Sequence, residues 1–533
     1  MGYDFKKIKN KIKGAANTNK NPKELAKEAL FVGFWLFAVI FITIAILDLW
    51  LNLTPCFRLF TGDLDSARYL LSALAQVQAA IIALVVTLTL VAVQLASQSY
   101  SPRVMDLFGS FRNYPFWLLL LLYFVSIMYD VMVLGTLDSK KLNELPVNRI
   151  SFAVFLTGFA IAALVPYTRN VINNLKPENV IKQIIGKINR KDIKEFVENI
   201  NKTVEEKKKE NISYTYHPRD LEGGKHKIIP VVDIIKRAIK EDDITTSREG
   251  IREIGKIFEY VFSLKELINR NEENLVRHFG YHLETIGDRA VFREDGDSVI
   301  EVCSALGKIG KSTAEKELDY AAGMAANSLG KIGAAAAEKG LDYAAVMAAD
   351  SLGRVGAATA EKGLNGAAGI SVESLGKVGV AAAEKGLDNA AGISADYLGK
   401  VGAAAAEKGL DNAAQRAADS LEKIGVAAAG KGLDNAAQRA ADSLGKVGVA
   451  AAEIRLTGGT WWAAVHLCKL GVVFIRHEID INGLINDMIK MHEKSSMQVE
   501  GGIANCKFIL EKEGDESKLN AFQEFKTQLT FLK

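Results

Sequence analysis

Proline and cysteine are scarce in this 533-residue sequence. None of the nine prolines follows Pro230, so the residue that most strongly breaks helices is missing from the whole second part of the chain. The four cysteines, Cys56, Cys303, Cys468 and Cys506, lie far apart and form no Cys-x-x-Cys pair. This spacing predicts neither a zinc site nor a disulfide framework. The net charge of +3 is too small to predict a nucleic-acid partner.

Motifs for catalysis and cofactor binding are missing as well. The sequence contains no Gly-x-Ser-x-Gly, His-Glu-x-x-His or dinucleotide-binding fingerprint. Residues 305–312 approach a phosphate-binding loop, but Ala305 replaces its first glycine and no predicted strand precedes it. His278 and His282 have the spacing of two metal ligands on one helix face, but no third ligand is evident, and two packed or solvated histidines are the simpler interpretation. We therefore expect no enzyme, no cofactor and no metal.

The chain has instead a repeat of 23 residues between His282 and Ile485. Each copy has a leucine followed four residues later by a glycine, and the clearest copies read Leu-Gly-Lys-Ile/Val-Gly. The leucines are Leu283, Leu306, Leu329, Leu352, Leu375, Leu398, Leu421, Leu444 and Leu467. The glycines are Gly287, Gly310, Gly333, Gly356, Gly379, Gly402, Gly425, Gly448 and Gly471. A fixed period of this length indicates stacked units that bury their apolar faces against one another.

One copy, residues 410–432, shows what each unit is expected to build. Asp411 is a candidate N-cap, and apolar residues then recur every three or four positions up to Ile424, as on one face of a helix. Because glycine is a poor helix former, we expect Gly425 to interrupt this helix, a short second helix to follow, and Gly432 to end it. The alternative, a long amphipathic helix lying on a membrane, is disfavoured by the number of glycines.

The pattern Ala-Ala-x-x-Leu-Gly-Lys-Ile-Gly resembles the short HEAT-like repeats of the phycobilisome-lyase type, over residues 282–485. The resemblance implies an α-solenoid that acts as a protein-binding or scaffolding surface. Since the period is shorter than that of ordinary HEAT units, we expect the second helix of each unit to be abbreviated.

Four apolar runs precede the repeats, at about residues 30–51, 69–98, 116–134 and 150–167. Each is long enough to cross a bilayer and is bounded by polar or charged residues. The first run is too long for a signal peptide and no small-residue cleavage site follows it, so we expect it to remain as an anchor. The sequence therefore predicts an integral membrane protein of the all-α class, with a four-helix transmembrane domain followed by a cytoplasmic α-solenoid of 23-residue HEAT-like repeats.

Positive charge sets the expected orientation. Residues 1–28 are rich in lysine, and more lysines and arginines follow the fourth run, whereas the loops around Arg58 and Lys140 have fewer. Because positively charged segments stay on the cytoplasmic side, we expect a multi-pass protein of the cell membrane with both termini and the repeats in the cytoplasm. Residues 1–28 are either a solvated tail or a basic amphipathic helix attached to anionic lipid.

The second run is more polar than the other three. Its small and polar residues recur at three, four or seven positions and so share one helix face. The polar members of this face are Ser72, Gln76, Thr87, Gln94 and Gln98. Because polar groups are costly in hydrocarbon unless they face protein or water, we expect this face to pack against another helix or to line an aqueous path.

The third run contains an acid, Asp130. An ionisable residue inside a span is a candidate for cation or proton handling. Because Asp130 lies toward the end of the run that is distant from the cytoplasm, an interfacial position is the alternative.

The end of the second run carries the clearest family resemblance. Residues 88–94, Leu-Thr-Leu-Val-Ala-Val-Gln, and 95–103, Leu-Ala-Ser-Gln-Ser-Tyr-Ser-Pro-Arg, are similar to the hallmark of a family of predicted membrane proteins, domain of unknown function 2254. Residues 232–238 resemble a later segment of that family, but the Ser-Pro-Gly-Ile-Asn-Asp-Pro expected after them is absent. The family implies further spans and a soluble tail, and it implies no reaction.

Within this motif, Ser101, Pro102 and Arg103 mark the exit from the membrane. Pro102 stops the helix, and Arg103 is placed to meet lipid phosphates or helix-end carbonyls. We interpret the three residues as a membrane-exit anchor, or alternatively as a gate or coupling element to the following domain.

These observations divide the chain into six segments. They are a basic N-terminal segment (1–28), the transmembrane domain (29–170), a charged linker (171–250), a helical lead-in (251–281), the solenoid (282–485) and a C-terminal helical cap (486–533). We expect a membrane protein that presents the solenoid as a scaffold or sensor for an unidentified cytoplasmic protein. The alternative is a homo-oligomeric channel- or transporter-like protein, in which the second run lines the path and the solenoid regulates it.

Overall fold

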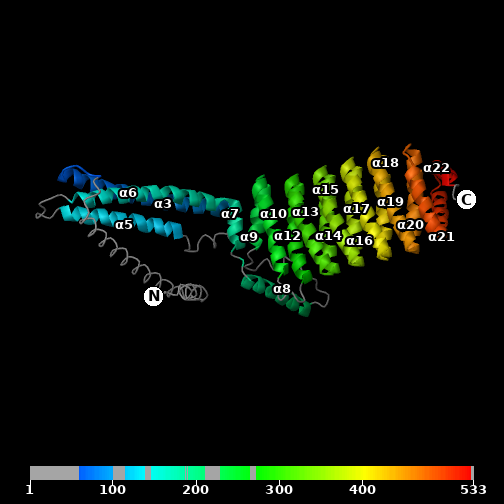
Figure 1. Ribbon diagram of the computed structural model, residues 1–533, viewed down its shortest axis with the longest axis horizontal. Helices are drawn as coiled ribbons and strands as arrows, with labels where there is room; N and C mark the ends of the chain where they lie inside the picture. Colours follow the sequence, from blue (N-terminus) through cyan, green and yellow to red (C-terminus); the bar gives the residue numbers. More distant parts are fainter. Residues whose placement is uncertain are drawn as a thin grey trace. The chain divides into compact units, whose positions relative to one another are not determined.

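The computed structural model describes residues 59–99, 114–137, 146–186, 188, 190–210, 228–263 and 272–529. Within these ranges the regular elements are helices and no strand occurs, which confirms the all-α class. The chain divides into two compact units, one with the described residues up to Leu175 and the other with those from Lys176 onward (Figure 1). The basic segment 1–28, the predicted first span 30–51 and Cys56 lie outside the described residues.

The first unit is a bundle of apolar helices. Its elements are α3 (Leu64–Ser99), α5 (Tyr114–Leu137) and α6 (Val147–Leu175), and each packs on the other two. Each holds a stretch long and apolar enough to cross a membrane, namely Leu64–Val91, Trp117–Leu137 and Val147–Arg169. These stretches coincide with the predicted second, third and fourth spans.

The second unit begins with α7 (Pro177–Gly186), α8 (Arg190–Glu210), α9 (Ile228–Lys240), α10 (Ile244–Ser263) and α12 (Glu272–Phe292). The regular stack follows, with α13 (Gly296–Glu315), α14 (Asp319–Glu338), α15 (Asp342–Glu361), α16 (Asn365–Glu384), α17 (Asp388–Glu407), α18 (Asp411–Gly430), α19 (Asp434–Glu453) and α20 (Thr457–Arg476). The last helices are α21 (Asn482–Glu513) and α22 (Glu516–Gln528), which pack on the end of the stack. Figure 1 shows the helices from α10 to α21 side by side in chain order. The start predicted for the helical lead-in, residue 251, falls inside α10, and the start predicted for the solenoid, residue 282, falls inside α12.

Each 23-residue period builds one helix and one short turn, not two helices. Helix α18 has 20 residues and continues through Gly425, where we expected an interruption. The turn consists of Lys431, Gly432 and Leu433, and α19 starts at Asp434. The expectation of an abbreviated second helix is therefore wrong. The glycine does not interrupt the helix, because it lies at a contact with another helix.

The helices form two layers, since each packs on the next helix and on the one after it. We call α12, α14, α16, α18 and α20 the A layer, and α13, α15, α17, α19 and α21 the B layer. The structural unit, one helix of each layer, therefore spans two sequence periods. A unit of this size matches the roughly 40–47 residues of ordinary HEAT repeats. Helix α20 is also apolar and long enough to cross a membrane, but it is mostly buried within the stack.

The second glycine of the signature is a contact point between helices of one layer. A Cβ at Gly310 would lie 2.7 Å from a methyl group of Val355, and one at Gly356 would lie 2.8 Å from a methyl group of Val401. From Gly287 to Gly402, the side chain that fills the space above the glycine is the Ile or Val of the same signature, two helices further on. Leu470, Met491 and Phe525 take this place at the last three glycines, Gly425, Gly448 and Gly471. Glycine thus lets same-layer helices approach closely, which offsets its low helix propensity.

A different glycine ends the helices. Gly340, Gly386 and Gly432 adopt φ of +77°, +78° and +69°, the left-handed region that glycine enters at little cost. The N–H of the following leucine then donates to a carbonyl in the last turn, as Leu341 does to Ala336 at 2.9 Å. This Schellman-type ending keeps the turn at three residues and fixes the period.

The aspartate that starts most of the helices caps a different helix from its own. In α18 the N-cap residue is Leu410, and the predicted N-cap Asp411 instead accepts a hydrogen bond from the N–H of Gly459 in α20 at 2.8 Å. Asp388 does the same for Ala436 of α19 at 3.0 Å. Asp319 and Asp342 form the same kind of bond with Ala367 and Ala390. These four aspartates therefore each satisfy an otherwise unpaired N–H at the start of the next helix in the same layer, and so link the repeats.

Candidate functional site

A polar layer crosses the bundle of apolar helices. Gln78 of α3 donates from Nε2 to Asp130 Oδ2 of α5 at 2.7 Å and to Thr157 Oγ1 of α6 at 2.6 Å. All three side chains are buried, and they join the three helices. Asp130 is thus buried in the bundle, where Gln78 of the neighbouring helix α3 donates to it.

Apolar clusters lie on both sides of this layer. Leu71, Val133 and Ala153 belong to one cluster, and Val85, Tyr123 and Ala160 belong to the other. On α3 the residues Leu71, Gln78 and Val85 follow one another at intervals of seven, the spacing of a helix-packing seam. Gln78 and Thr157 were not among the residues singled out from the sequence.

Several polar atoms of this layer have no hydrogen-bond partner within the described residues. They are Asp130 Oδ1, Gln78 Oε1 and the hydroxyl of Ser126, which lies one helical turn before Asp130. Buried polar atoms are nearly always satisfied by protein, water or a ligand. The layer therefore has the capacity to accept a proton, a cation or water.

The predicted polar face of the second span lies elsewhere. Gln76, Thr87 and Gln94 are exposed on the outside of the bundle formed by α3, α5 and α6, and Ser72 is half-buried. Thr87 donates to the Ala83 carbonyl of its own helix at 2.8 Å. Neither α5 nor α6 covers this face, so its role stays a prediction. The side chain of Gln98 and the motif Ser101, Pro102 and Arg103 lie outside the described residues.

In the solenoid, two hollows open on the A layer. One of about 430 Å³ lies between α12 and α14, and another of about 620 Å³ spans α14, α16 and α18. The second is lined by charges of both signs. They are Glu338, Glu373, Glu384, Asp419, Lys377, Arg416 and Lys423.

The hollow between α12 and α14 combines an aromatic and cationic rim with an apolar floor. Arg277 lies 5.4 Å from the ring centre of Tyr320 and donates a hydrogen bond to its hydroxyl, and Tyr281 lies beside them. The Tyr320 side chain is 51% exposed. Val276 and Ile309 contribute apolar surface. Tyrosine and arginine around a pocket are the residue types that most often anchor protein partners.

The side chains of His278 and His282, both on α12, are buried. Their rings meet edge to face with centres 4.6 Å apart, and Phe196 of α8 contacts His278. Both ring nitrogens of His282 lack a hydrogen-bond partner within the described residues. Burial, aided by the charge of Lys236, lowers the pKa of His282 from 6.5 to about 4.

This burial predicts a pH dependence of stability. The folded state holds His282 neutral, whereas the unfolded chain binds its proton near the ordinary pKa, so stability is full above about pH 6.5 and falls as the pH drops toward 4. We expect a loss of up to about 3 kcal/mol across this window. His282→Phe should remove that part of the dependence, measured as the free energy of unfolding at pH 7 and pH 5. An unchanged difference between the two pH values would contradict the assignment.

The described features define an all-α membrane protein that joins a bundle of apolar helices to a solenoid. A family model described as "Predicted membrane protein (DUF2254)" matches residues 27–242. This match confirms the family resemblance over these residues. A solved structure described as a "Circular tandem repeat protein with novel repeat topology and enhanced subunit contact surfaces" is similar at a TM-score of 0.32 and 11% identity, covering 78% of this chain and 97% of that chain. No curated protein matches the chain.

Proposed function

We propose that this membrane protein presents its solenoid in the cytoplasm as a non-enzymatic surface that binds a protein partner. The observation that carries the proposal is the hollow between α12 and α14, with Arg277, Tyr281 and Tyr320 at its rim. A hollow of this composition suits an apolar or aromatic side chain of a partner, while the charged hollow further along the A layer suits the polar edge of the same interface.

The proposed location is the cell membrane, with both termini in the cytoplasm. It is supported by the lysines and arginines of residues 1–28 and of the segment after α6, because positive residues remain on the cytoplasmic side. The three apolar helices of the first unit supply the anchor.

The test compares two tyrosines at one register position. Tyr320 lies in the A layer at the hollow, whereas Tyr343, one period later, lies in the B layer and is 66% exposed. We expect Tyr320→Ala to weaken partner binding by about 2 kcal/mol or more, roughly 30-fold, and Tyr343→Ala to leave it unchanged. The measurement is quantitative capture of partners from native membranes by the full-length protein. Equal capture by both variants and the unaltered protein would argue against this face.

A second candidate function is ion or proton translocation by an oligomer, with the solenoid as regulator. The buried layer of Gln78, Asp130 and Thr157 favours it, because an acid buried in a bundle of apolar helices with one donor and unsatisfied neighbours is costly unless it takes up a proton or a cation. If the protein translocates ions, the ion path passes through the buried layer and not along the outer face of α3.

A further inference from the structure

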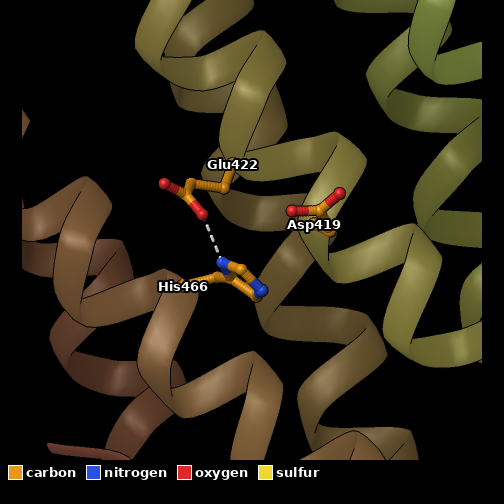
Figure 2. Close-up of side chains that lie close together, drawn as sticks. All are labelled: Asp419, Glu422 and His466. Carbon is orange, nitrogen blue, oxygen red and sulfur yellow. Dashed lines mark hydrogen bonds and ion pairs between the residues drawn. The ribbon is translucent and has the colours of Figure 1, made fainter. Parts of the chain in front are cut away.

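Three polar side chains meet between α18 and α20, near the end of the A layer. Glu422 Oε2 of α18 is paired with His466 Nδ1 of α20, and Asp419, one turn before Glu422, lies beside them (Figure 2). One atom of each side chain that can bind a metal lies within 4.8 Å of the corresponding atoms of the other two.

These residues depart from the repeat at the positions that touch. At this register a glycine of one helix normally faces a serine two helices further on, as Gly330 faces Ser374 and Gly399 faces Ser443. In α18 and α20, Glu422 and His466 replace that glycine and serine. Because a glycine facing a serine is the commonest pair at this register, the repeat itself does not require an acid paired with a buried histidine here.

The surroundings prepare the group for a cation. His466 is only 3% exposed, and its ring stacks on Trp462 with centres 5.5 Å apart, which fixes the imidazole. Burial opposes the ionisation of Glu422, but its contacts with His466 and Lys469 outweigh burial and hold the pKa of Glu422 below its usual value.

Two lysines balance the carboxylates in the described structure. Lys469 lies 3.4 Å from Glu422, and Lys423 lies 2.7 Å from Asp419. The Lys423 side chain is 62% exposed, so it is free to move into solvent when a cation takes its place. Asp419 also lines the hollow of about 620 Å³ on the A layer, which gives an ion a route to the group.

We propose that Asp419, Glu422 and His466 form a binding site for a divalent transition-metal ion of the zinc class. One imidazole nitrogen and two carboxylate oxygens suit Zn²⁺, with water as a further ligand, whereas Mg²⁺ and Ca²⁺ prefer oxygen ligands alone. Bound there, the ion joins α18 to α20 and tightens the last interface of the A layer before the stack ends.

The test measures Zn²⁺ binding to the full-length protein in detergent, purified without a histidine tag and treated with chelator. We expect one site per chain, and an affinity at least about 100-fold lower in the double variant E422G/H466S, which restores the residues of the ordinary repeat. Glu422→Gln provides a second variant that keeps the side-chain shape. Zn²⁺ should also raise the unfolding temperature of the unaltered protein and not that of the variants.

Glu284 supplies the matched control. It occupies the position of Glu422 in α12, but it meets Ser328 and Lys331 at 2.6 and 2.8 Å and no histidine. Glu284→Gln should leave Zn²⁺ binding unchanged. Failure to bind Zn²⁺, equal binding by the Glu422 and His466 variants, or equally tight binding of Mg²⁺ would each overturn the proposal.

Discussion

Gly402→Ala is expected to destabilise the solenoid by roughly 1–3 kcal/mol. The added Cβ would lie 2.6 Å from the Cβ of Ala417 in α18 and 2.7 Å from a methyl group of Val447 in α19. The Ala417 side chain is a single methyl group and Val447 is branched at Cβ, so neither can bend away and relief requires the helices themselves to move apart. The measurement is the free energy of unfolding of the full-length protein in detergent, followed by the loss of helical circular dichroism.

Gly430 provides the control for this substitution. It is the last residue of α18, and a Cβ there would meet no atom within 4 Å. Gly430→Ala should therefore stabilise the protein by a few tenths up to about 1 kcal/mol, because alanine is the better helix former. If Gly402→Ala were stabilising as well, the signature glycines would not be contact points and the packing described for the layers would be wrong.

Asp130→Asn and Gln78→Leu are expected to lower proton or cation flux by about tenfold or more if the protein translocates ions. Asp130→Asn removes the acid that can take up a proton or hold a cation, whereas Gln78→Leu removes the hydrogen bond to that acid, worth roughly 1.5–3 kcal/mol, which corresponds to about tenfold or more in rate. The assay is flux into liposomes that hold the purified full-length protein, with an imposed membrane potential and a pH-sensitive dye inside.

Gln76→Leu is the matched control for Gln78→Leu. The two glutamines lie two residues apart on α3, but Gln76 is exposed on the outside of the described bundle while Gln78 is buried in it. Flux that is lost in Gln78→Leu and kept in Gln76→Leu would support a path through the buried layer. The opposite pattern, with flux lost in Gln76→Leu and kept in Gln78→Leu, would indicate a path along the outer face of α3. If neither the unaltered protein nor any folded variant shows flux, the translocation function is wrong.

The period of the solenoid can be predicted from the sequence, but the meaning of its glycines cannot. The propensity of glycine predicts a break at Gly425, yet the helix continues there because Leu470 of α20 fills the space above it. The period alone does not reveal that the contacting helix is two copies away. Only the two-layer arrangement shows why the first glycine, the β-branched residue and the second glycine recur together.

The polar layer of the bundle could be predicted only in part. Asp130 stands out because any acid in an apolar run is conspicuous, but Gln78 was overlooked in favour of the polar face that includes Gln76. The signal that would have found Gln78 is the apolar seam, since it lies midway between Leu71 and Val85 at intervals of seven. Thr157 gives no such signal, because a threonine in a span is common and its partner depends on the packing of α3 against α6.

The most direct test of the proposed function is photocrosslinking in native membranes, with a photoreactive amino acid at position 320 or at position 343 of the full-length protein. We expect one discrete partner protein to crosslink from position 320, in the A layer, and none of it to crosslink from position 343, in the B layer. Crosslinks of equal strength from both positions, or to lipid alone from position 320, would contradict the claim that the A layer binds a protein.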